Sequence, residues 1–289
     1  MIVWSVSAML RSFSVPNTTC TTMAIRTILV PYDFSECATD ALRVAAKLAR
    51  RTGAWIDVVH LYAQKTDFHT ENQRVRDEIE ARLEQVPDLP FLKGIELKKF
   101  MLRQMGVTEI FKNERLQKAD LVVMGTHGAT GIRGGIVGSN TQRIVRQAPM
   151  PVLVIKHRIE DFDVKDLVYA SNFTPQDVDK FDAFSPFIEL FDPRIHLVKV
   201  NTPRSFERSD DSNKAIDTFL QRYDLKKYTA SVYNDLSIEE GILNFAKGID
   251  ADLIAMATHG RTGFFHVVNG SLTEDIVNRT SFPVLSVKL

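Results

Sequence analysis

The fold of this chain is decided by a stretch that occurs twice. The sequence reads ADLVVMGTHGATGIRGGIVGSNTQRIVRQAPMPVLVIK at residues 119–156 and ADLIAMATHGRTGFFHVVNGSLTEDIVNRTSFPVLSVK at residues 251–288. The two copies align without a gap, 132 residues apart, and 18 of the 38 aligned positions are identical. The repeat extends toward the N-terminus, where LVPYDFS at residues 29–35 matches VYASNFT at residues 168–174. A period this long indicates a tandem duplication of one domain rather than a solenoid.

Length and composition agree with two globular domains. The chain has 289 residues, of which 44% are hydrophobic and 25% are charged, as in ordinary globular proteins. Lys and Arg together number 36, and so do Asp and Glu, so the formal net charge is zero. A balanced charge argues against nucleic acid or an anionic membrane surface as the main partner, because both select a basic excess.

Two further features of the sequence bear on its location. No apolar run reaches the roughly 18 residues that a membrane helix needs, so we expect no membrane span. Cys20 and Cys37 are too few for a disulfide framework and lack metal-ligand spacing. The cysteine count fits a reducing compartment, and we expect a cytoplasmic protein.

We expect three segments. Residues 1–23 form an N-terminal extension, either disordered or the result of a start placed upstream of Met23. A signal peptide is the weaker alternative, because the segment has neither a basic start before its apolar residues nor a small-residue cleavage site. Residues 24–157 form the first domain and residues 158–289 the second.

Strand and helix patterns alternate within each copy. In the first copy the predicted strands are residues 25–31, 55–61, 95–102, 120–124 and 152–155, and the predicted helices are residues 35–51, 71–85, 107–117 and 140–147. In the second copy the predicted strands are residues 167–170, 195–200, 228–233, 253–257 and 284–287. Ser35 is the expected N-cap of the first helix and Gly53 its stop. The alternation predicts right-handed βαβ units and an α/β fold of two tandem doubly wound domains, each a parallel sheet covered on both faces.

A glycine pattern marks the most specific candidate site. Gly125 and Gly128 are followed after nine residues by Gly138 and Ser139, in the order G-x2-G-x9-G-S. The pattern starts where an apolar strand ends and finishes where a helix begins. Glycines let the backbone approach a phosphate, and the free N–H groups at a helix start attract an anion. Asp33 follows the first strand, so Asp33 and this loop flank a ligand crevice if the strand order reverses between them.

Three motifs together resemble the universal stress protein family: the opening P-x-D-F-S at residues 31–35, the glycine pattern, and the final strand P-V-L-V at residues 151–154. The resemblance covers nearly all of residues 24–289, and the duplication is similar to that of tandem members. It implies a five-stranded parallel sheet of order 3-2-1-4-5 in each domain and, in one branch of the family, an ATP site accompanied by Mg²⁺ or Mn²⁺.

The resemblance also implies which residues hold the nucleotide. Asp33, with Pro31, would face the nucleoside, and the backbone of Leu61 would meet the adenine. The ribose and phosphates would be held by Gly125, Gly128, Gly138 and Ser139, with Met124, His127 and Asn140 beside them. The matching positions of a weaker second site are Asn172, Val200, Gly260, Gly270 and Ser271.

The second copy departs from the pattern at three positions. Asn172 stands for Asp33, Ala257 for Gly125 and Ala170 for Pro31. Asn loses the carboxylate charge, and a Cβ at position 257 crowds a close backbone approach. We therefore expect nucleotide binding in the first copy and weak or lost binding in the second. A surviving phosphate-type site with a different base preference is the alternative.

Each candidate residue has a structural interpretation beside the functional one. The glycine loop can be a tight connection, and His127 and His259 orient a loop more readily than they act as bases, because no carboxylate partner is visible. His60, His69 and His196 lack zinc-like spacing, so we expect no metal ligation by protein side chains. Cys37 fits a small packed thiol, and the charged run at residues 204–213 fits a flexible flap or linker.

Three functions remain open. The leading one is a nucleotide-dependent regulatory or protective binding module of a stress response, without catalytic residues, because no G-x4-G-K-[ST] motif, metal-holding acidic pair or general base is evident. The second is a slow ATPase or a phosphoryl or nucleotidyl transferase. The third is a nucleotide-free scaffold for protein partners that the sequence does not identify.

The final strands at residues 152–155 and 284–287 would each lie at a sheet edge and invite pairing. The resemblance implies that they pair with each other as an internal pseudo-dimer. A further homodimer is compatible with the sequence.

Overall fold

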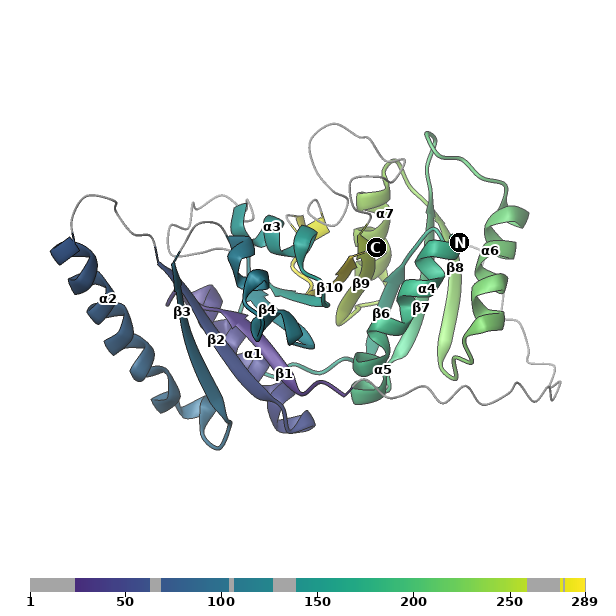
Figure 1. The fold of residues 1–289 in the computed structure, drawn as a ribbon. Coiled ribbons are helices and arrows are strands. Elements are labelled where there is room, and N and C mark those ends of the chain that lie inside the picture. Colours follow the sequence, from purple (N-terminus) through teal and green to yellow (C-terminus); the bar gives the residue numbers. More distant parts are fainter. Residues whose placement is uncertain are drawn as a thin grey trace.

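The computed structural model describes residues 24–62, 69–103, 107–126, 139–258, 276–277 and 279–288. Its strands form one ten-stranded sheet in the order β3-β2-β1-β4-β5-β10-β9-β6-β7-β8 (Figure 1). Read inward from each edge of the sheet, each half repeats the order 3-2-1-4-5 that the family resemblance implies. The α/β fold with two doubly wound parallel halves is therefore confirmed.

The first repeat supplies the half of the sheet that ends at β3. Its strands are β1 (Thr27–Pro31), β2 (Trp55–Tyr62), β3 (Leu97–Arg103), β4 (Leu121–Gly125) and β5 (Val152–Ile155). Its helices are α1 (Glu36–Thr52), α2 (His69–Glu84) and α3 (Ser139–Gln147), with short 3-10 helices η1 (Val86–Asp88), η2 (Pro90–Leu92), η3 (Val107–Lys112) and η4 (Leu116–Lys118).

The second repeat supplies the other half. Its strands are β6 (Asp166–Ala170), β7 (Arg194–Asn201), β8 (Tyr228–Asn234), β9 (Leu253–Thr258) and β10 (Val284–Lys288). Its helices are α4 (Pro175–Lys180), the 3-10 helix η5 (Phe181–Phe184), α5 (Ser185–Phe191), α6 (Ser209–Arg222) and α7 (Ile238–Gly248).

Two hydrophobic clusters cover the two faces of the sheet. Successive residues of β1 alternate between them: Ile28 and Val30 pack in the cluster that contains α1, and Leu29 packs in the cluster that contains α3. Each cluster also includes residues of the second repeat, from α4, α5 and α6 in the first and from α7 in the second. Burial on both faces explains why the strand sequences are continuously apolar.

Local sequence signals set the ends of α1 as predicted. The Ser35 side chain accepts a hydrogen bond from the Ala38 N–H, and Glu36 lies in the first turn, where the helix dipole favours a negative charge. Gly53 ends the helix with φ +75°, and its N–H donates to the Ala49 carbonyl.

The predicted helix at residues 107–117 is instead two 3-10 segments, η3 and η4. The Asn113 side-chain oxygen lies between them and accepts hydrogen bonds from the N–H groups of Arg115 at 3.1 Å and Leu116 at 3.3 Å. These local bonds compete with the regular helical pattern, so the Asn side chain divides the helix.

The expectation of a flexible flap at residues 204–213 is wrong for its second half. Ser209 begins α6, and the acidic side chains of Asp210 and Asp211 lie in its first turn. Negative charge at the start of a helix is stabilising, which explains why this charged run folds. Ser212 is fully buried.

The first helix of the second repeat is divided and packed by aromatic rings. Thr174 and Asp177 form a capping box at the start of α4, and a proline opens both α4 and α5. Six aromatic rings pack against one another at the place that the single helix α1 takes in the first repeat. They belong to Tyr169, Phe173, Phe181, Phe184, Phe219 and Tyr223. Burial raises the pKa of the Tyr169 phenol well above its usual value.

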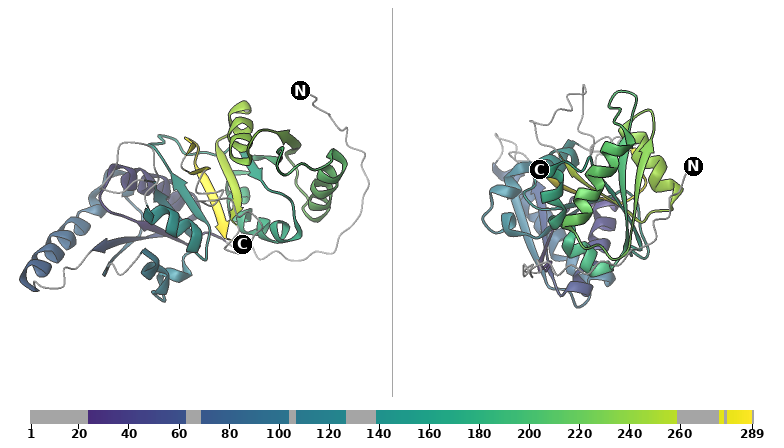
Figure 2. Two further views of the ribbon diagram at one scale, coloured as in Figure 1. Left: turned by 90° about the horizontal axis from the view of Figure 1, so that it is seen from above. Right: turned by 90° about the vertical axis from the view of Figure 1, so that its right-hand side faces the viewer.

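The two repeats are joined by their final strands, which lie at the middle of the molecule (Figure 2). β10 pairs antiparallel with β5, and Leu285 stands opposite Leu153. All four residues of β5 are buried. The pairing of residues 152–155 with residues 284–287, implied by the resemblance, is therefore present within the chain.

Residues 1–23 lie outside the described residues, so the expectation for the N-terminal extension stays a prediction. The described helices include none with the length and apolarity to cross a bilayer.

A buried serine in this central seam provides a test of its packing. Ser286 is 1% exposed, and its hydroxyl makes no hydrogen bond with the part of the chain that the structure describes. Ser286→Ala should therefore stabilise the protein by about 1 kcal/mol, because it removes an unsatisfied buried hydroxyl. Ser212→Ala is the matched control: this fully buried serine donates to Glu207, and its loss should destabilise by about 1 kcal/mol. Equal destabilisation of both variants in urea unfolding would contradict this account.

Candidate functional site

The first repeat has a topological switch point at the carboxyl end of β1. β1 pairs with β2 on one side, with Pro31 opposite Val59, and with β4 on the other, with Leu29 opposite Val122. The chain continues from β1 toward β2 and from β4 toward β5, so the connections diverge at this point. Open α/β sheets bind ligands where the strand order reverses in this way. Pro31 and Gly125, both half-buried, end the two strands that flank this position.

Asp33 lies in the turn that leads from β1 into α1. Its side chain is half-buried, and its Oδ1 accepts a hydrogen bond from the Ser35 N–H at 3.1 Å. Phe34 takes a left-handed backbone conformation with φ +63°. Phe173, the matching residue of the second repeat, does the same with φ +57°. Non-glycine residues rarely adopt this conformation, so its presence in both repeats shows a turn that the surrounding structure enforces.

A buried histidine lies on the β2 side of this turn. His60 Nδ1 is 2.7 Å from the Tyr32 carbonyl oxygen, so Nδ1 carries the hydrogen and donates it. Burial lowers the pKa of His60 below its usual value of 6.5, although the Tyr32 carbonyl and the nearby Asp33 charge act in the opposite direction. The imidazole is therefore neutral at pH 7, with Nε2 as an acceptor.

Aromatic and cationic side chains surround His60. The Phe34 ring centroid is 4.8 Å from that of His60, and the guanidinium of Arg82, from α2, lies 3.9 Å from the Phe34 centroid. Leu61 follows His60 in β2 and is half-buried against the core. Sequence reasoning did not assign Phe34 or Arg82 to the site. Arg82 was missed because α2 is far from β1 along the chain.

Packing of α1 against β4 explains why residue 125 is a glycine. A Cβ at Gly125 would lie 2.7 Å from the Cys37 carbonyl oxygen and 2.7 Å from its Sγ, both closer than real Cβ contacts. The close approach of α1 to β4 is therefore sufficient to require glycine at this position. The sequence pattern explains the same glycine by the approach of a phosphate. Cys37 Sγ lies 3.7 Å from the Ile155 carbonyl oxygen, in agreement with a packed thiol.

The start of α3 is fixed beside the end of β4. Ser139 is the first residue of α3, and the buried hydroxyl of Thr141 donates to the Gly125 carbonyl at 3.1 Å or the Thr126 carbonyl at 3.3 Å. Thr126 in turn donates its N–H to the Ile155 carbonyl. These bonds hold the unpaired N–H groups of the first turn of α3 close to the carboxyl end of β4. The role of Thr141 was missed because it depends on contacts across 15 or 16 residues.

The remaining predicted residues of the first site differ in their placement. Asn140 is exposed on α3. Met124 is 4% exposed and its side chain packs in the core, so only its backbone reaches the edge of the sheet. His127, Gly128 and Gly138 lie outside the described residues.

The second repeat has a different arrangement at the matching position. Asn172 is half-buried in the turn after β6, and Val200 is 7% exposed. A Cβ on Gly241 of α7 would lie 2.5 Å from Val200 Cγ1, so α7 packs directly on Val200. Lys199, beside Val200, donates to the Asn172 carbonyl. Gly260, Gly270 and Ser271 lie outside the described residues.

No described set of three or more His, Cys, Asp or Glu side chains is arranged to hold a metal ion. His196 instead contacts the Thr229 hydroxyl through Nδ1 and the Asp166 carboxylate through Nε2, both at 2.8 Å.

The fold defines a duplicated, doubly wound α/β protein with a topological switch point at the carboxyl end of β1 in its first repeat. The model of the family described as "Universal stress protein family" matches residues 24–156 and 186–288. The chain belongs to this family. The second match begins after β6, the strand at the switch point of the second repeat, so the boundary between residues 157 and 158 stays a prediction.

Relatives and solved structures support the tandem arrangement. Universal stress protein Slr1230 of Synechocystis is 24% identical over 291 residues, covering 91% of this chain and 100% of the relative. A universal stress protein of Thermus aquaticus is 33% identical over 136 residues, covering 45% of this chain and 98% of the relative. The crystal structure of a universal stress protein from Archaeoglobus fulgidus matches with a TM-score of 0.69 at 18% identity, covering 91% of this chain and 98% of that one.

A universal stress protein in complex with cAMP also matches. It covers 47% of this chain and 99% of that protein, with a TM-score of 0.38 and 22% identity.

The contact at Gly125 predicts a strong effect of a single methyl group. Gly125→Ala should destabilise the protein by about 1–3 kcal/mol, because the added Cβ meets backbone atoms of Cys37 that cannot move independently of α1. Gly248→Ala is the control: nothing lies within 4 Å of the Cβ position at the end of α7, so this change should be neutral or slightly stabilising. Urea unfolding measures both, and a Gly125→Ala protein of wild-type stability would show that the contact is not restrictive.

The buried imidazole predicts a pH dependence of stability. As the pH falls below 6.5, the unfolded state takes up a proton on His60 while the folded state resists it, because burial lowers its pKa. The free energy of unfolding should therefore decrease between pH 7.5 and 5.5. His60→Asn, which can still donate to the Tyr32 carbonyl, should show a smaller decrease. Identical decreases for the two proteins in urea titrations would argue against a depressed His60 pKa.

Proposed function

We propose that this chain is an ATP-binding, cytoplasmic stress-response protein that holds its nucleotide mainly in the first repeat and acts as a regulatory or protective binding module. The observation that carries the proposal is the placement of Asp33 and the start of α3 on the two sides of one switch point. A carboxylate can accept from a nucleobase or ribose, and a helix start attracts phosphate, so the two ends of this crevice match the two ends of a nucleotide.

The residues of the first repeat fit the nucleoside in their charge and hydrogen bonding. Asp33 is oriented by its bond from the Ser35 N–H. His60 is neutral at pH 7 and buried, so it adds no competing positive charge beside the base. The half-buried Leu61 leaves its backbone at the carboxyl edge of β2, where the adenine would be recognised.

The phosphates would be held by the α3 start and the glycine pattern. Ser139 begins α3, and Thr141 anchors its first turn to β4. Gly128 and Gly138 complete the pattern in the sequence. A divalent cation, Mg²⁺ or Mn²⁺, would accompany the nucleotide through its phosphate oxygens, because the described residues offer no protein metal cluster.

A binding role is favoured over catalysis by the residue types present. The sequence has no Walker-type lysine motif, and His60 is committed through Nδ1 to the Tyr32 carbonyl. An ATP that is bound without a positioned base or protein-held metals would be hydrolysed slowly or not at all. The expected output is therefore a shift in conformation or partners when ATP binds.

Calorimetric titration with ATP and Mg²⁺ tests the proposal. The wild-type chain should bind close to one ATP. Asp33→Ala should weaken binding about 10- to 100-fold, which corresponds to the loss of a charged hydrogen bond of roughly 1.5–3 kcal/mol. Asn172→Ala, at the matching position of the second repeat, should leave the binding unchanged. Absence of binding by the wild-type protein would favour the scaffold function instead.

The glycine pattern allows a second, independent comparison. Gly138→Val should abolish ATP binding, because a branched side chain at the helix start blocks the phosphates, whereas Gly270→Val should not. Chromatography of the nucleotide after incubation distinguishes storage from turnover. Rapid ADP formation that depends on Asp33 would support the ATPase alternative.

A further inference from the structure

Strand register shows that Lys199 occupies in the second repeat the position that His60 occupies in the first. Val59 of β2 stands opposite Pro31, and Val198 of β7 stands opposite Ala170. Pro31 and Ala170 are matching residues, so the next residues along β2 and β7, His60 and Lys199, also match. A neutral imidazole in one repeat is therefore replaced by an ammonium group in the other.

The longer lysine side chain reaches further across the turn. His60 bonds to the carbonyl of Tyr32, the residue before Asp33. Lys199 Nζ instead donates at 3.2 Å to the carbonyl of Asn172, which stands where Asp33 does. The lysine side chain is only 7% exposed, so its charge is placed inside the carboxyl end of the sheet.

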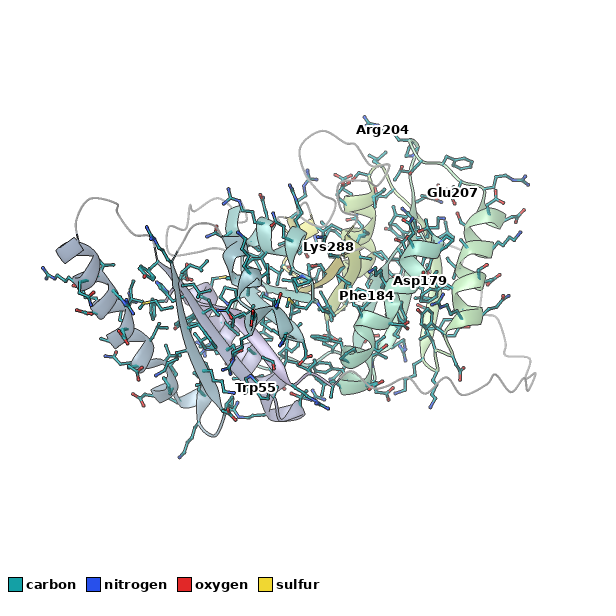
Figure 3. All side chains as sticks on the ribbon, in the orientation of Figure 1. Trp55, Asp179, Phe184, Arg204, Glu207 and Lys288 are labelled. Carbon is teal, nitrogen blue, oxygen red and sulfur yellow. The ribbon has the colours of Figure 1, made fainter. Side chains whose placement is uncertain are left out.

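The charge of Lys199 is balanced by Glu207, whose Oε2 lies 2.7 Å from Nζ. Glu207 is on the segment between β7 and α6, at the upper edge of the second repeat near Arg204 (Figure 3). Its backbone is fixed at both polar atoms: the N–H donates to Asn201 Oδ1 at 2.9 Å, and the carbonyl accepts from Asn201 Nδ2 at 3.1 Å. Ser212 also donates to its carboxylate.

The ion pair is therefore built into the fold at both ends. Lys199 comes from the interior of β7, and Glu207 is held by Asn201 at the end of β7 and by Ser212 in α6. Lys199 contacts Asn172, the position that matches Asp33, and it directly precedes Val200, the position that matches Leu61.

We propose that Lys199 and Glu207 fill the base-binding part of the second crevice and thereby restrict the chain to one nucleotide. This inference rests on the proposed nucleotide function of the first repeat. A base entering between Asn172 and Val200 would have to separate Lys199, whose side chain is 7% exposed, from Glu207, whose side chain is 49% exposed. The buried ammonium group would then lose its carboxylate partner, which is unfavourable. The ion pair is then the main reason why the second repeat does not bind a nucleotide. The replacement of the carboxylate of Asp33 by the amide of Asn172 contributes less.

The test removes the ion pair and places at position 199 the residue type of His60. The variant carries Lys199→His and Glu207→Gln, which removes both charges and keeps the backbone bonds of residue 207 to Asn201. Calorimetric titration with ATP and Mg²⁺ should give one site per wild-type chain and two per variant chain, the new site at least tenfold tighter than any second-site binding by the wild type. In an added Asp33→Ala background, only the new site should keep its affinity.

The matched control uses another Lys–acid pair of the same repeat. Lys227 and Asp192 form an exposed pair at the opposite ends of the strands, and Lys227→His with Asp192→Asn should leave one site per chain. Thermal unfolding checks that each variant folds.

Each remaining outcome is decisive. One site in both the wild type and a folded Lys199→His, Glu207→Gln variant would overturn the inference and leave the function of the first repeat intact. Two tight sites in the wild type would also overturn it. No site in either protein would overturn the inference together with the proposed function.

Discussion

The antiparallel pairing of β5 with β10 is the constraint on which the rest of the structure depends. It converts the final apolar strand of each repeat from an exposed edge into the middle of one sheet, where all four residues of β5 are buried. Among the described strands, β3 and β8 then form the edges, and Lys98 and Lys99 on β3 protect one of them from pairing with another chain. The pairing also lets two hydrophobic clusters extend across both repeats.

Within this shared frame the two repeats have diverged where a ligand would lie. Both keep a phenylalanine with positive φ after the first strand, so the turn itself is preserved. The first repeat places a carboxylate and a neutral imidazole at this turn, and the second places an amide and a buried lysine that is paired with the half-exposed Glu207. The two switch points therefore differ in charge and in hydrogen bonding.

The sequence predicts the strands, their order and the ends of α1 well, because these depend on local apolar runs, caps and a family pattern. It predicts less well what depends on contacts between distant segments. The sequence assigned Gly125 to phosphate binding and did not predict its packing against α1, where an added Cβ would lie 2.7 Å from the Cys37 carbonyl oxygen. Asn113 divides a predicted helix through its own side chain, a choice that apolar spacing does not reveal. Lys199 stands in the apolar run IHLVKV, where a buried charge was a signal that could have been followed to Glu207.

The central claim is that a nucleotide binds at the carboxyl ends of β1 and β4 in the first repeat. A crystal structure of the full chain grown with ATP and Mg²⁺ tests it most directly. The account predicts density for the base beside Asp33 and Leu61, density for the phosphates at the start of α3, and no nucleotide beside Asn172 and Val200. Nucleotide density in the second repeat, or an empty first crevice at saturating ATP, would contradict it.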